Sequence, residues 1–369
     1  MTSGFATALP VTALHAGGMT LPRGQLVLAN ADGFFHCVSR CVRRAWLCGT
    51  DSYTGKCFEH RRDWVEARLL ALAEVFAVSV WAYAVMSNHL HVVVEVRADA
   101  ARGWSDGEVA RRWLALYPPP DGDPDTAVRL LTANTPRIAV LRERLSSLSW
   151  LMKSLNEHLA RRANAEDGCT GRFWEGRFRC QALLDEAAVL AAMTYVDLNP
   201  IRAGMTERLD ESHHTSIIRR IATEVEARAR PIIRVEAPCD LPGPNGDSKH
   251  YNQTASTPPQ SSQAQVRLAP IAGLSGHTLS LSTASYIDFV DFAGRHWHPG
   301  KRGRISGPVP KLARAHGKNP ELWLERVQSL MSPGSFARAM GSVEALTDLA
   351  TRLGQRWIKG IAIARAMAV

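Results

Sequence analysis

Three features that define other large classes of protein are missing from this chain. No apolar run in its 369 residues reaches the roughly 18 residues that a membrane-spanning helix needs. The first residues have no basic start and no sustained apolar stretch, so we expect no secretory signal. The Gly-Lys-Ser or Gly-Lys-Thr phosphate-binding loop of ATP-driven enzymes is also missing. These absences favour a cytoplasmic protein whose chemistry does not consume ATP.

Cysteine is sparse and irregularly spaced. The seven cysteines are an odd number without a regular framework, which is typical of a protein in a reducing compartment. Cys37, Cys41, Cys48 and Cys57 lie close together in the sequence but form no Cys-x-x-Cys pair. A zinc site at these cysteines stays an alternative, although the irregular spacing favours buried free thiols.

Acidic residues are missing from one long stretch near the C-terminus. Residues 295–318 contain no Asp or Glu, in a chain whose net charge is +9. The basic residues of this stretch are Arg295, Lys301, Arg302, Arg304, Lys311, Arg314 and Lys318. A solvated loop is the usual explanation for such a run, but the complete absence of acids favours contact with a nucleic acid. We expect this stretch to add DNA affinity rather than chemistry.

The apolar pattern predicts an α+β fold. Residues 78–85 and 89–96 are two β-rich runs joined by a short turn, which is typical of a hairpin. The other predicted elements are a strand at 34–39, helices at 61–77 and 141–163, a strand at 178–184, and a helix that Asp185 caps and that ends at Asn199–Pro200. Their order predicts a ferredoxin-like antiparallel sheet with helices on one face.

Changes in composition divide the chain into segments. Residues 1–30 form a small-residue leader, and residues 31–225 hold the predicted sheet and its helices. Gly, Pro and Asp clusters mark residues 97–140 as an insertion around one amphipathic piece. Pro, Gly, Ser, Asn and Gln dominate residues 235–265, which predicts a flexible linker. Residues 266–369 are predicted to form a mostly helical, basic C-terminal module.

Two histidines stand at the start of the second run of the hairpin. His89 and His91 flank Leu90, and side chains alternate between the faces of a strand, so both imidazoles point the same way. Two adjacent imidazoles on a rigid strand can bind a divalent metal, and such a metal can polarise a phosphate. A solvated strand face is the usual explanation for a His-x-His pair taken alone.

The last predicted helix supplies a candidate nucleophile. Tyr195 and Asn199 are four residues apart, so they lie on the same side of the helix. A phenol can attack a phosphodiester when a metal draws charge from the phosphate. The amide oxygen of Asn199 could complete the coordination of Mg²⁺ or Mn²⁺ by the histidine pair. Without the histidines, Tyr195 would be interpreted as a core residue and Asn199 as the residue before a helix-ending proline.

Three segments resemble those of a known family when they are taken together. They are His89-Leu90-His91 after Met86-Ser87-Asn88, then Gly171-Arg172-Phe173-Trp174-Glu175-Gly176-Arg177-Phe178, and then the Tyr-x-x-Leu-Asn-Pro-x-Arg-Ala-Gly pattern from Tyr195 to Gly204. In this order and spacing they resemble the REP-associated tyrosine transposases, which belong to the HUH single-tyrosine transposase superfamily. The resemblance extends over residues 20–225 of the chain.

The resemblance implies a ferredoxin-like catalytic domain and a specific set of site residues. His89 and His91 would be the metal-binding pair, with Asn199 as a third ligand. Tyr195 would be the nucleophile that becomes linked to a 5′ DNA end. The implied substrate is single-stranded DNA near hairpins of the REP type, and the implied cofactor is Mg²⁺ or Mn²⁺. The protein would act as a monomer or a homodimer.

Basic and aromatic residues are candidates for contact with the DNA. The candidate phosphate-binding residues are Arg172, Arg177, Arg179, Arg302 and Arg304. Trp174 lies among the first three of them, and an exposed tryptophan can stack on an unpaired base. The alternative is that Phe173 and Trp174 are core residues.

Two other functions stay open from the sequence. One is a nucleic-acid-binding regulator that keeps the scaffold without catalysis, although such a protein would be expected to lose the tyrosine or a histidine. The other is a metallohydrolase that uses the histidine pair without a covalent intermediate. A metallohydrolase of that kind would not need Tyr195.

Overall fold

The computed structural model describes residues 32–366 apart from several internal segments. The residues it does not describe within that range are 43–45, 52–53, 120–122, 230–266, 297, 299, 310–318 and 332–336. The predicted leader and the predicted linker therefore lie outside the described residues. The same is true of Lys311, Arg314 and Lys318 in the acid-free stretch.

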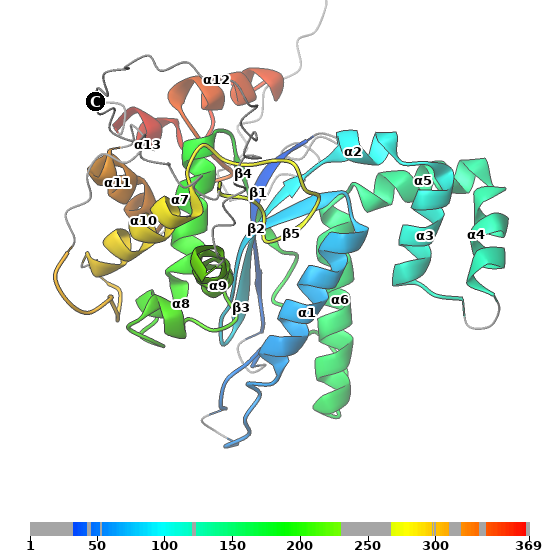
Figure 1. Cartoon of the computed structure of the whole chain (residues 1–369), viewed down its shortest axis with the longest axis horizontal. Helices are drawn as coiled ribbons and strands as arrows, with labels where there is room; N and C mark the ends of the chain where they lie inside the picture. The colour runs from blue at the N-terminus through cyan, green and yellow to red at the C-terminus, as the bar shows by residue number, and fades with distance from the viewer. Residues whose placement is uncertain are drawn as a thin grey trace, which may run out of the picture.

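A six-stranded sheet with the order β5-β2-β3-β1-β4-β6 forms the centre of the molecule (Figure 1). Its longer strands are β1 (Gly33–Arg40), β2 (Val78–Val85), β3 (His89–Val96) and β4 (Arg179–Leu183). Each neighbouring pair among these four is antiparallel, and β2 and β3 form the hairpin with the predicted bounds. The order of these strands along the chain and in the sheet is ferredoxin-like, so the α+β class is confirmed.

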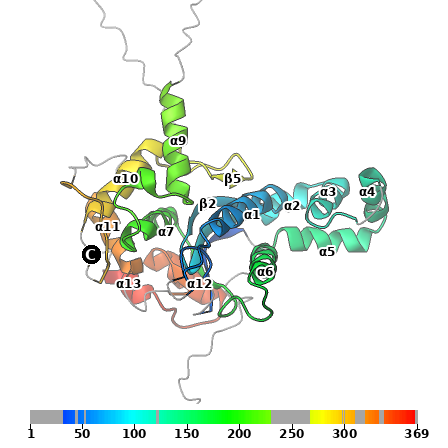
Figure 2. The same cartoon turned by 90° about the horizontal axis from the view of Figure 1, so that it is seen from below.

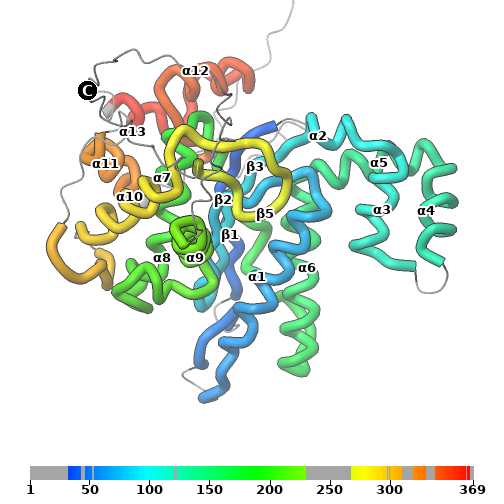
Figure 3. The backbone as a smooth tube through the Cα atoms, in the orientation of Figure 1, coloured from blue at the N-terminus to red at the C-terminus, as the bar shows by residue number. Residues whose placement is uncertain are grey.

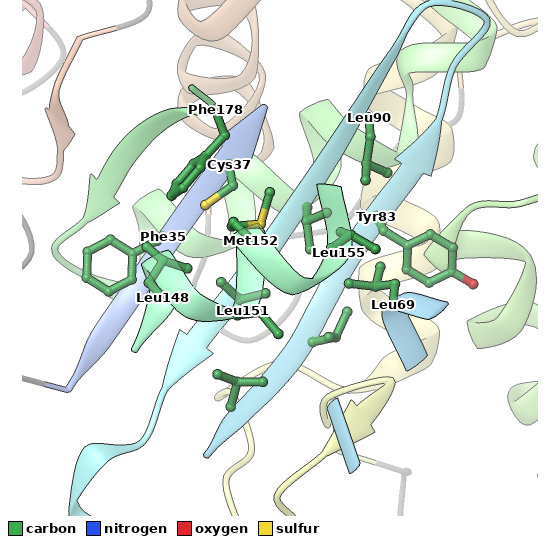
Figure 4. Packing of buried hydrophobic residues seen from close by; sticks show 14 of the residues in the cluster. Phe35, Cys37, Leu69, Tyr83, Leu90, Leu148, Leu151, Met152, Leu155 and Phe178 are labelled. Atoms are coloured by element: carbon green, nitrogen blue, oxygen red, sulfur yellow. The ribbon is translucent and has the colours of Figure 1, made fainter. Parts of the chain in front are cut away.

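Two long helices cover the first face of the sheet. They are α1 (Arg61–Val75) and α6 (Leu148–Glu166). Leu90 on β3 points to this face and packs in a buried cluster with Leu69 of α1 and Leu155 of α6 (Figure 4). Removal of this apolar surface from water is the main stabilising contribution of the layer. This is the layer of helices that the sequence predicts.

The second face of the sheet is also covered by helices. These are α7 (Glu186–Asp197), α10 (Thr283–Arg295) and α11 (Pro320–Met331), which form a second buried cluster with Val93 of β3. Nearly all residues of α7 are buried, because it lies between the sheet and the C-terminal helices. A helix that is apolar on all sides needs packing partners on more than one side. The expectation of helices on one face only is therefore wrong.

The insertion at residues 97–140 folds mainly into helices. They are α2 (Ala98–Gly103), α3 (Asp106–Leu116), α4 (Pro124–Thr132) and α5 (Thr135–Leu145). These helices project from one end of the sheet in two perpendicular views (Figures 1 and 2). Val109 and Ile138 are buried in a small hydrophobic cluster within the projection. The sequence predicts only one amphipathic piece here, whereas α4 and α5 begin at the capping residues Asp123 and Asn134 and α2 begins without a side-chain cap.

The single helix predicted at residues 141–163 is in fact two helices. α5 ends at Leu145 and α6 begins at Leu148. Between them, the Ser147 hydroxyl accepts a hydrogen bond from the Trp150 amide at 3.4 Å and caps α6. A serine in this position satisfies an amide that the first turn of a helix leaves unpaired, so it favours a new helix start.

The described residues between 267 and 366 pack against the same sheet. β5 (Ala272–Gly273) pairs with β2, and β6 (Ala339–Met340) pairs with β4, so these residues extend both edges. α12 (Val343–Arg352) contributes to the cluster on the first face, while α10 and α11 contribute to the cluster on the second. Figure 3 shows the yellow-to-red part of the chain around the sheet. The predicted domain boundaries stay a prediction, and the packing is shared across them.

The remaining elements lie after α7 and near the C-terminus. They are α8 (Asn199–Arg202), a 3-10 turn at Leu209–Glu211, α9 (Ser216–Ala229) and α13 (Ile361–Ala366). Within the described part of the chain, no helix is both long and apolar enough to cross a membrane.

The cysteines near the first strand are free thiols. Cys37, Cys41 and Cys48 are buried and form no disulfide, and Cys57 is exposed. Burial raises the pKa of the Cys48 thiol to about 12, so this group stays protonated and unreactive at neutral pH. The interpretation as buried free thiols is confirmed for the first three cysteines.

Candidate active site

His89 and His91 project from the start of β3 onto the face of the sheet that α7 covers. Leu90 between them is buried in the cluster on the opposite face, as strand alternation predicts. The centroids of the two imidazole rings are 4.8 Å apart, and the ring planes are 77° from each other. The two rings are therefore neighbours that could serve one ion.

One nitrogen of each ring in the pair is held by a neighbour. Nδ1 of His89 lies 2.6 Å from the Asn88 side-chain oxygen, and Nδ1 of His91 lies 3.0 Å from Nε2 of His36. A ligating histidine commonly uses one ring nitrogen for the metal and the other for such an orienting contact. The contacts here leave Nε2 of both rings for a ligand.

Burial keeps both rings neutral at physiological pH. It is the largest influence on His89, whose pKa is lowered to about 4, and the charge of Arg40 lowers it further. Burial, followed by the charge of His89, also holds the pKa of His91 well below its usual value. A metal binds the lone pair of a neutral imidazole, so the environment keeps the pair in its ligating form.

His36 is a third histidine of the site and is not among the residues predicted from the sequence. It lies buried on β1, with its ring stacked on that of His91 at 5.2 Å and meeting the Tyr195 ring edge-on at 5.8 Å. Burial lowers its pKa to about 4, and a hydrogen bond with Gln181 raises it slightly. The only sequence signal is a polar residue inside the apolar strand predicted at residues 34–39. His36 is therefore placed to orient His91 rather than to bind an ion.

Tyr195 reaches the histidines from α7, which begins as predicted. The side chain of Asp185 accepts a hydrogen bond from the Ala188 amide at 2.8 Å and caps the helix. The Tyr195 ring meets His91 edge-on, with centroids 5.5 Å apart and planes 85° from each other. Burial raises the pKa of its phenol, while a hydrogen bond from Asn199 lowers it. The phenol is consequently protonated at neutral pH.

Asn199 begins α8, one turn beyond Tyr195. Its side-chain nitrogen donates to the Tyr195 backbone carbonyl at 2.9 Å, which fixes the amide beside the tyrosine. Among the residues that the structure describes, no three His, Cys, Asp or Glu side chains are grouped to hold a metal. The candidate ligands predicted from the sequence are the two imidazoles and the Asn199 amide oxygen, and water would complete the coordination of an ion. This donor set fits Mg²⁺ or Mn²⁺, which keep water ligands and accept oxygen, better than a structural zinc ion.

The predicted DNA-binding arginines are exposed, and one of them lies on the face of the histidines. Arg172, Arg177, Arg179, Arg302 and Arg304 are all exposed. Arg179 pairs with Val38 across β4 and β1, and Val38 pairs with His91 across β1 and β3. Residues paired in register share a sheet face, so Arg179 stands on the same face as the histidine pair. Arg40 pairs with His89 in the same way and is a further cation of this face.

Trp174 is placed in the core and not on the surface. It is buried with Phe173 in the cluster on the first face, and the two rings meet at 90°. Its indole nitrogen donates to the Asn156 carbonyl at 2.8 Å. Both its ring and its polar atom are thus occupied, which favours the core alternative over base stacking for this residue.

Comparisons with known proteins give one distant match. No family model matches the chain, and no curated protein matches it. A solved structure described as a REP-associated tyrosine transposase bound to a REP hairpin is similar over 61% of this chain and 93% of that chain. The two share 13% sequence identity, and the TM-score is 0.31. A likeness this distant carries no argument about the function of this chain.

Proposed function

We propose that the protein is a metal-dependent DNA strand-transfer enzyme, a transposase that uses Tyr195 as its nucleophile. The observation that carries the proposal is the convergence of Tyr195 and His91, whose ring centroids are 5.5 Å apart although the residues come from α7 and β3. A half-buried tyrosine whose ring meets that of His91 brings a phenol close to two candidate metal ligands, which suits a phosphotyrosine mechanism. The resemblance of the three sequence segments supports the same assignment.

The proposed chemistry is a reversible exchange of two ester bonds. His89 and His91 would hold Mg²⁺ or Mn²⁺ through Nε2, with Asn199 as the third ligand, and the bound ion would draw charge from the scissile phosphate. The phenolic oxygen of Tyr195 forms a bond to phosphorus, and the bond from phosphorus to the 3′ oxygen breaks. The phenol loses its proton to solvent, and the 3′ oxygen gains one from solvent. The products are a 5′-phosphotyrosine and a free 3′-hydroxyl that can reverse the reaction.

The proposed substrate is single-stranded DNA near a hairpin. The net charge of +9 favours a polyanion, and Arg40 and Arg179 stand on the sheet face of the histidines. Single strands leave the backbone accessible to such a site, whereas paired strands do not bend easily into it. We keep the cytoplasm as the proposed location and a monomer or homodimer as the proposed assembly.

A covalent-adduct assay tests the proposal. The full chain is incubated with 3′-labelled and 5′-labelled hairpin DNA and Mn²⁺, and a denaturing gel is examined for DNA linked to protein. We expect an adduct that carries the 3′ label, that is lost with EDTA and that is lost in the Tyr195→Phe variant. Tyr117→Phe is the matched control, because Tyr117 is an exposed tyrosine of the helical insertion.

The same assay separates the alternatives. Cleavage that persists in Tyr195→Phe would select a metallohydrolase without a covalent intermediate. Hairpin binding by the native chain without any adduct or cleavage would select a non-catalytic DNA-binding regulator.

A further inference from the structure

The loop of residues 300–305, which follows α10, packs against α8. The Arg302 amide donates to the Arg202 carbonyl at 3.2 Å. Gly303 lies so close to α8 that a Cβ added there would be 2.1 Å from the Ile201 carbonyl oxygen. A Cβ contact this short does not occur, so only glycine allows the approach. The loop is thereby held one helical turn from Asn199.

The guanidinium group of Arg202 holds this loop through hydrogen bonds to backbone carbonyls. It donates to the carbonyls of Ala293 at 2.6 Å, His296 at 2.9 Å and Gly303 at 3.4 Å. Arg202 is buried, and burial lowers its pKa to about 10. It makes no ion pair with any residue that the structure describes, and its two terminal nitrogens donate to backbone carbonyls while Nε has no hydrogen-bond partner in the described part of the chain. The arginine of the Asn-Pro-x-Arg-Ala-Gly segment therefore fixes a part of the chain about 100 residues away in sequence.

Lys301 lies on this loop, directly before the two residues that contact α8. It is half-buried, and in the described part of the chain its ammonium group has no carboxylate partner. Burial and the charge of Arg202 lower its pKa, and its own charge lowers the pKa of His91. The titratable groups that act on His91 are His89, His36, Arg40 and Lys301, and each lowers its pKa. His89 and His36 are neutral at physiological pH, so Arg40 and Lys301 supply the positive charge of the site before any ligand is added.

An unpaired, half-buried ammonium group is a candidate binding group for an anion. Burial of a charge without a partner is costly, and a phosphate oxygen would offset the cost by accepting a charged hydrogen bond. A lysine ammonium is a compact point charge suited to a single phosphate oxygen. The Lys301 amide donates to the His298 carbonyl and the Arg302 amide donates to the Arg202 carbonyl, so the backbone is fixed and only the lysine side chain must be ordered on binding.

We propose that Lys301 binds a phosphate of the DNA strand at the His89–His91 site, and that Arg202 positions it there. The inference rests on the proposed function, because it takes the ligand of this site to be a DNA phosphate. It assigns one residue of the acid-free stretch to the active site itself. Arg295 has a different role, since it pairs with Asp291 at 2.6 Å and donates to the Ser306 carbonyl.

Binding of a short DNA strand by a catalytically silent chain tests the inference. A fluorescent ten-nucleotide thymidine strand is titrated with the Tyr195→Phe chain, alone or combined with Lys301→Met, Lys301→Arg or Lys359→Met. Lys359 is an exposed lysine of the C-terminal region and is the matched control. We expect Lys301→Met to weaken binding about tenfold, as the loss of a charged hydrogen bond does. Its plot of log K against log salt should also flatten by about 0.7.

The two remaining variants and a chemical footprint complete the test. Lys301→Arg should recover most of the affinity because it keeps the charge, and Lys359→Met should bind like the parent chain. In the unsubstituted protein, the bound strand should protect Lys301 from acetylation, which mass spectrometry measures without any substitution. Equal affinity and equal salt dependence for Lys301→Met, or no protection of Lys301 by bound DNA, would overturn the inference.

The outcome can be separated from that of the proposed function. If the unsubstituted chain forms no adduct but the Lys301→Met substitution weakens DNA binding, the phosphate contact is supported and the covalent step is not. If the native chain forms the adduct and Lys301→Met binds and reacts equally well, the covalent step holds and the role of Lys301 fails.

Discussion

His36 and His91 stack across neighbouring strands, with Nε2 of His36 lying 3.0 Å from Nδ1 of His91 and the ring planes 22° apart. Both residues are buried, and their strands β1 and β3 are paired in register beside them. A contact of this kind determines which nitrogen of His91 is available and in which direction it points. The geometry of the proposed metal site therefore depends on a residue that would not itself bind the metal.

The first prediction concerns this orienting contact. His36→Ala should weaken Mn²⁺ binding about 10-fold to 100-fold, the usual effect of removing a residue that orients a metal ligand. Titration calorimetry with Mn²⁺ measures the affinity. His158→Ala is the matched control, because His158 is an exposed histidine of α6. Unchanged Mn²⁺ affinity in His36→Ala would show that His91 needs no support from His36.

The second prediction concerns the ligands themselves. His89→Ala and His91→Ala should each abolish adduct formation and remove measurable Mn²⁺ binding, since two imidazoles are the only nitrogen donors proposed for the ion. Asn199→Ala should have a smaller effect, because water can replace one oxygen ligand. Calorimetry and the adduct gel measure the two effects on the same preparations. A double histidine variant with normal Mn²⁺ affinity would place the metal site elsewhere.

The sequence predicts the parts of the fold that are determined locally. The hairpin has the predicted bounds, because valine recurs in both runs, with aromatic residues beside it in the first. Asp185 caps α7 as expected, because capping depends on residues only three positions apart. The helix break at Ser147 has a local signal of the same kind, because Ser147 caps α6. The apolar stripe continues through this position, however, so the sequence predicts one helix instead of two. The spacing of His89 and His91 likewise fixes their common face without knowledge of the rest of the chain.

Long-range packing could not be predicted in the same way. His36 meets His91 only because of the register between two strands that are far apart in sequence, and a single sequence does not specify that register. The coverage of the second sheet face depends on helices that come after residues 230–266. The one local hint is α7, whose residues are apolar on all sides. The loop of Lys301 is held against α8 by the same long-range packing, so no spacing rule in the sequence could place it there.

The third prediction concerns the stability of the fold at low pH. Glu66 on α1 accepts hydrogen bonds from the Tyr83 hydroxyl at 2.6 Å and from Nδ1 of His214 at 2.9 Å, and it pairs with Arg219 at 2.7 Å. Burial alone would raise the pKa of this carboxyl, but these hydrogen bonds outweigh it and lower the pKa to about 2. The folded state therefore binds a proton less readily than the unfolded state.

The direction in which the free energy of unfolding changes with pH follows from this difference in the pKa of Glu66. The stabilisation by Glu66 is fully present above the unfolded pKa near 4.5 and is lost as the pH falls through the folded pKa of about 2. Glu66→Gln should lower the free energy of unfolding at pH 7 by about 2–3 kcal/mol and flatten its pH dependence between pH 4.5 and 2. Urea unfolding at a series of pH values measures this. Glu74→Gln at the end of α1 is the control. Parallel pH curves for Glu66→Gln and the native chain would contradict the prediction.

The last prediction links the packing of the C-terminal loop to the proposed active site. Gly303→Ala places a methyl group against the Ile201 carbonyl, so the loop must move away from α8. We expect a loss of about 1–3 kcal/mol in the free energy of unfolding, as for other overpacked contacts. We also expect an adduct yield reduced toward that of Lys301→Met, because displacement of the loop carries the ammonium group away from the histidines. Gly103→Ala is the matched control, since a Cβ there meets no atom within 4 Å. Thermal unfolding and the adduct gel, performed on the same samples, separate the two effects. A Gly303→Ala chain that is destabilised but still forms the full yield of adduct would mean that the loop stabilises the fold without serving the chemistry.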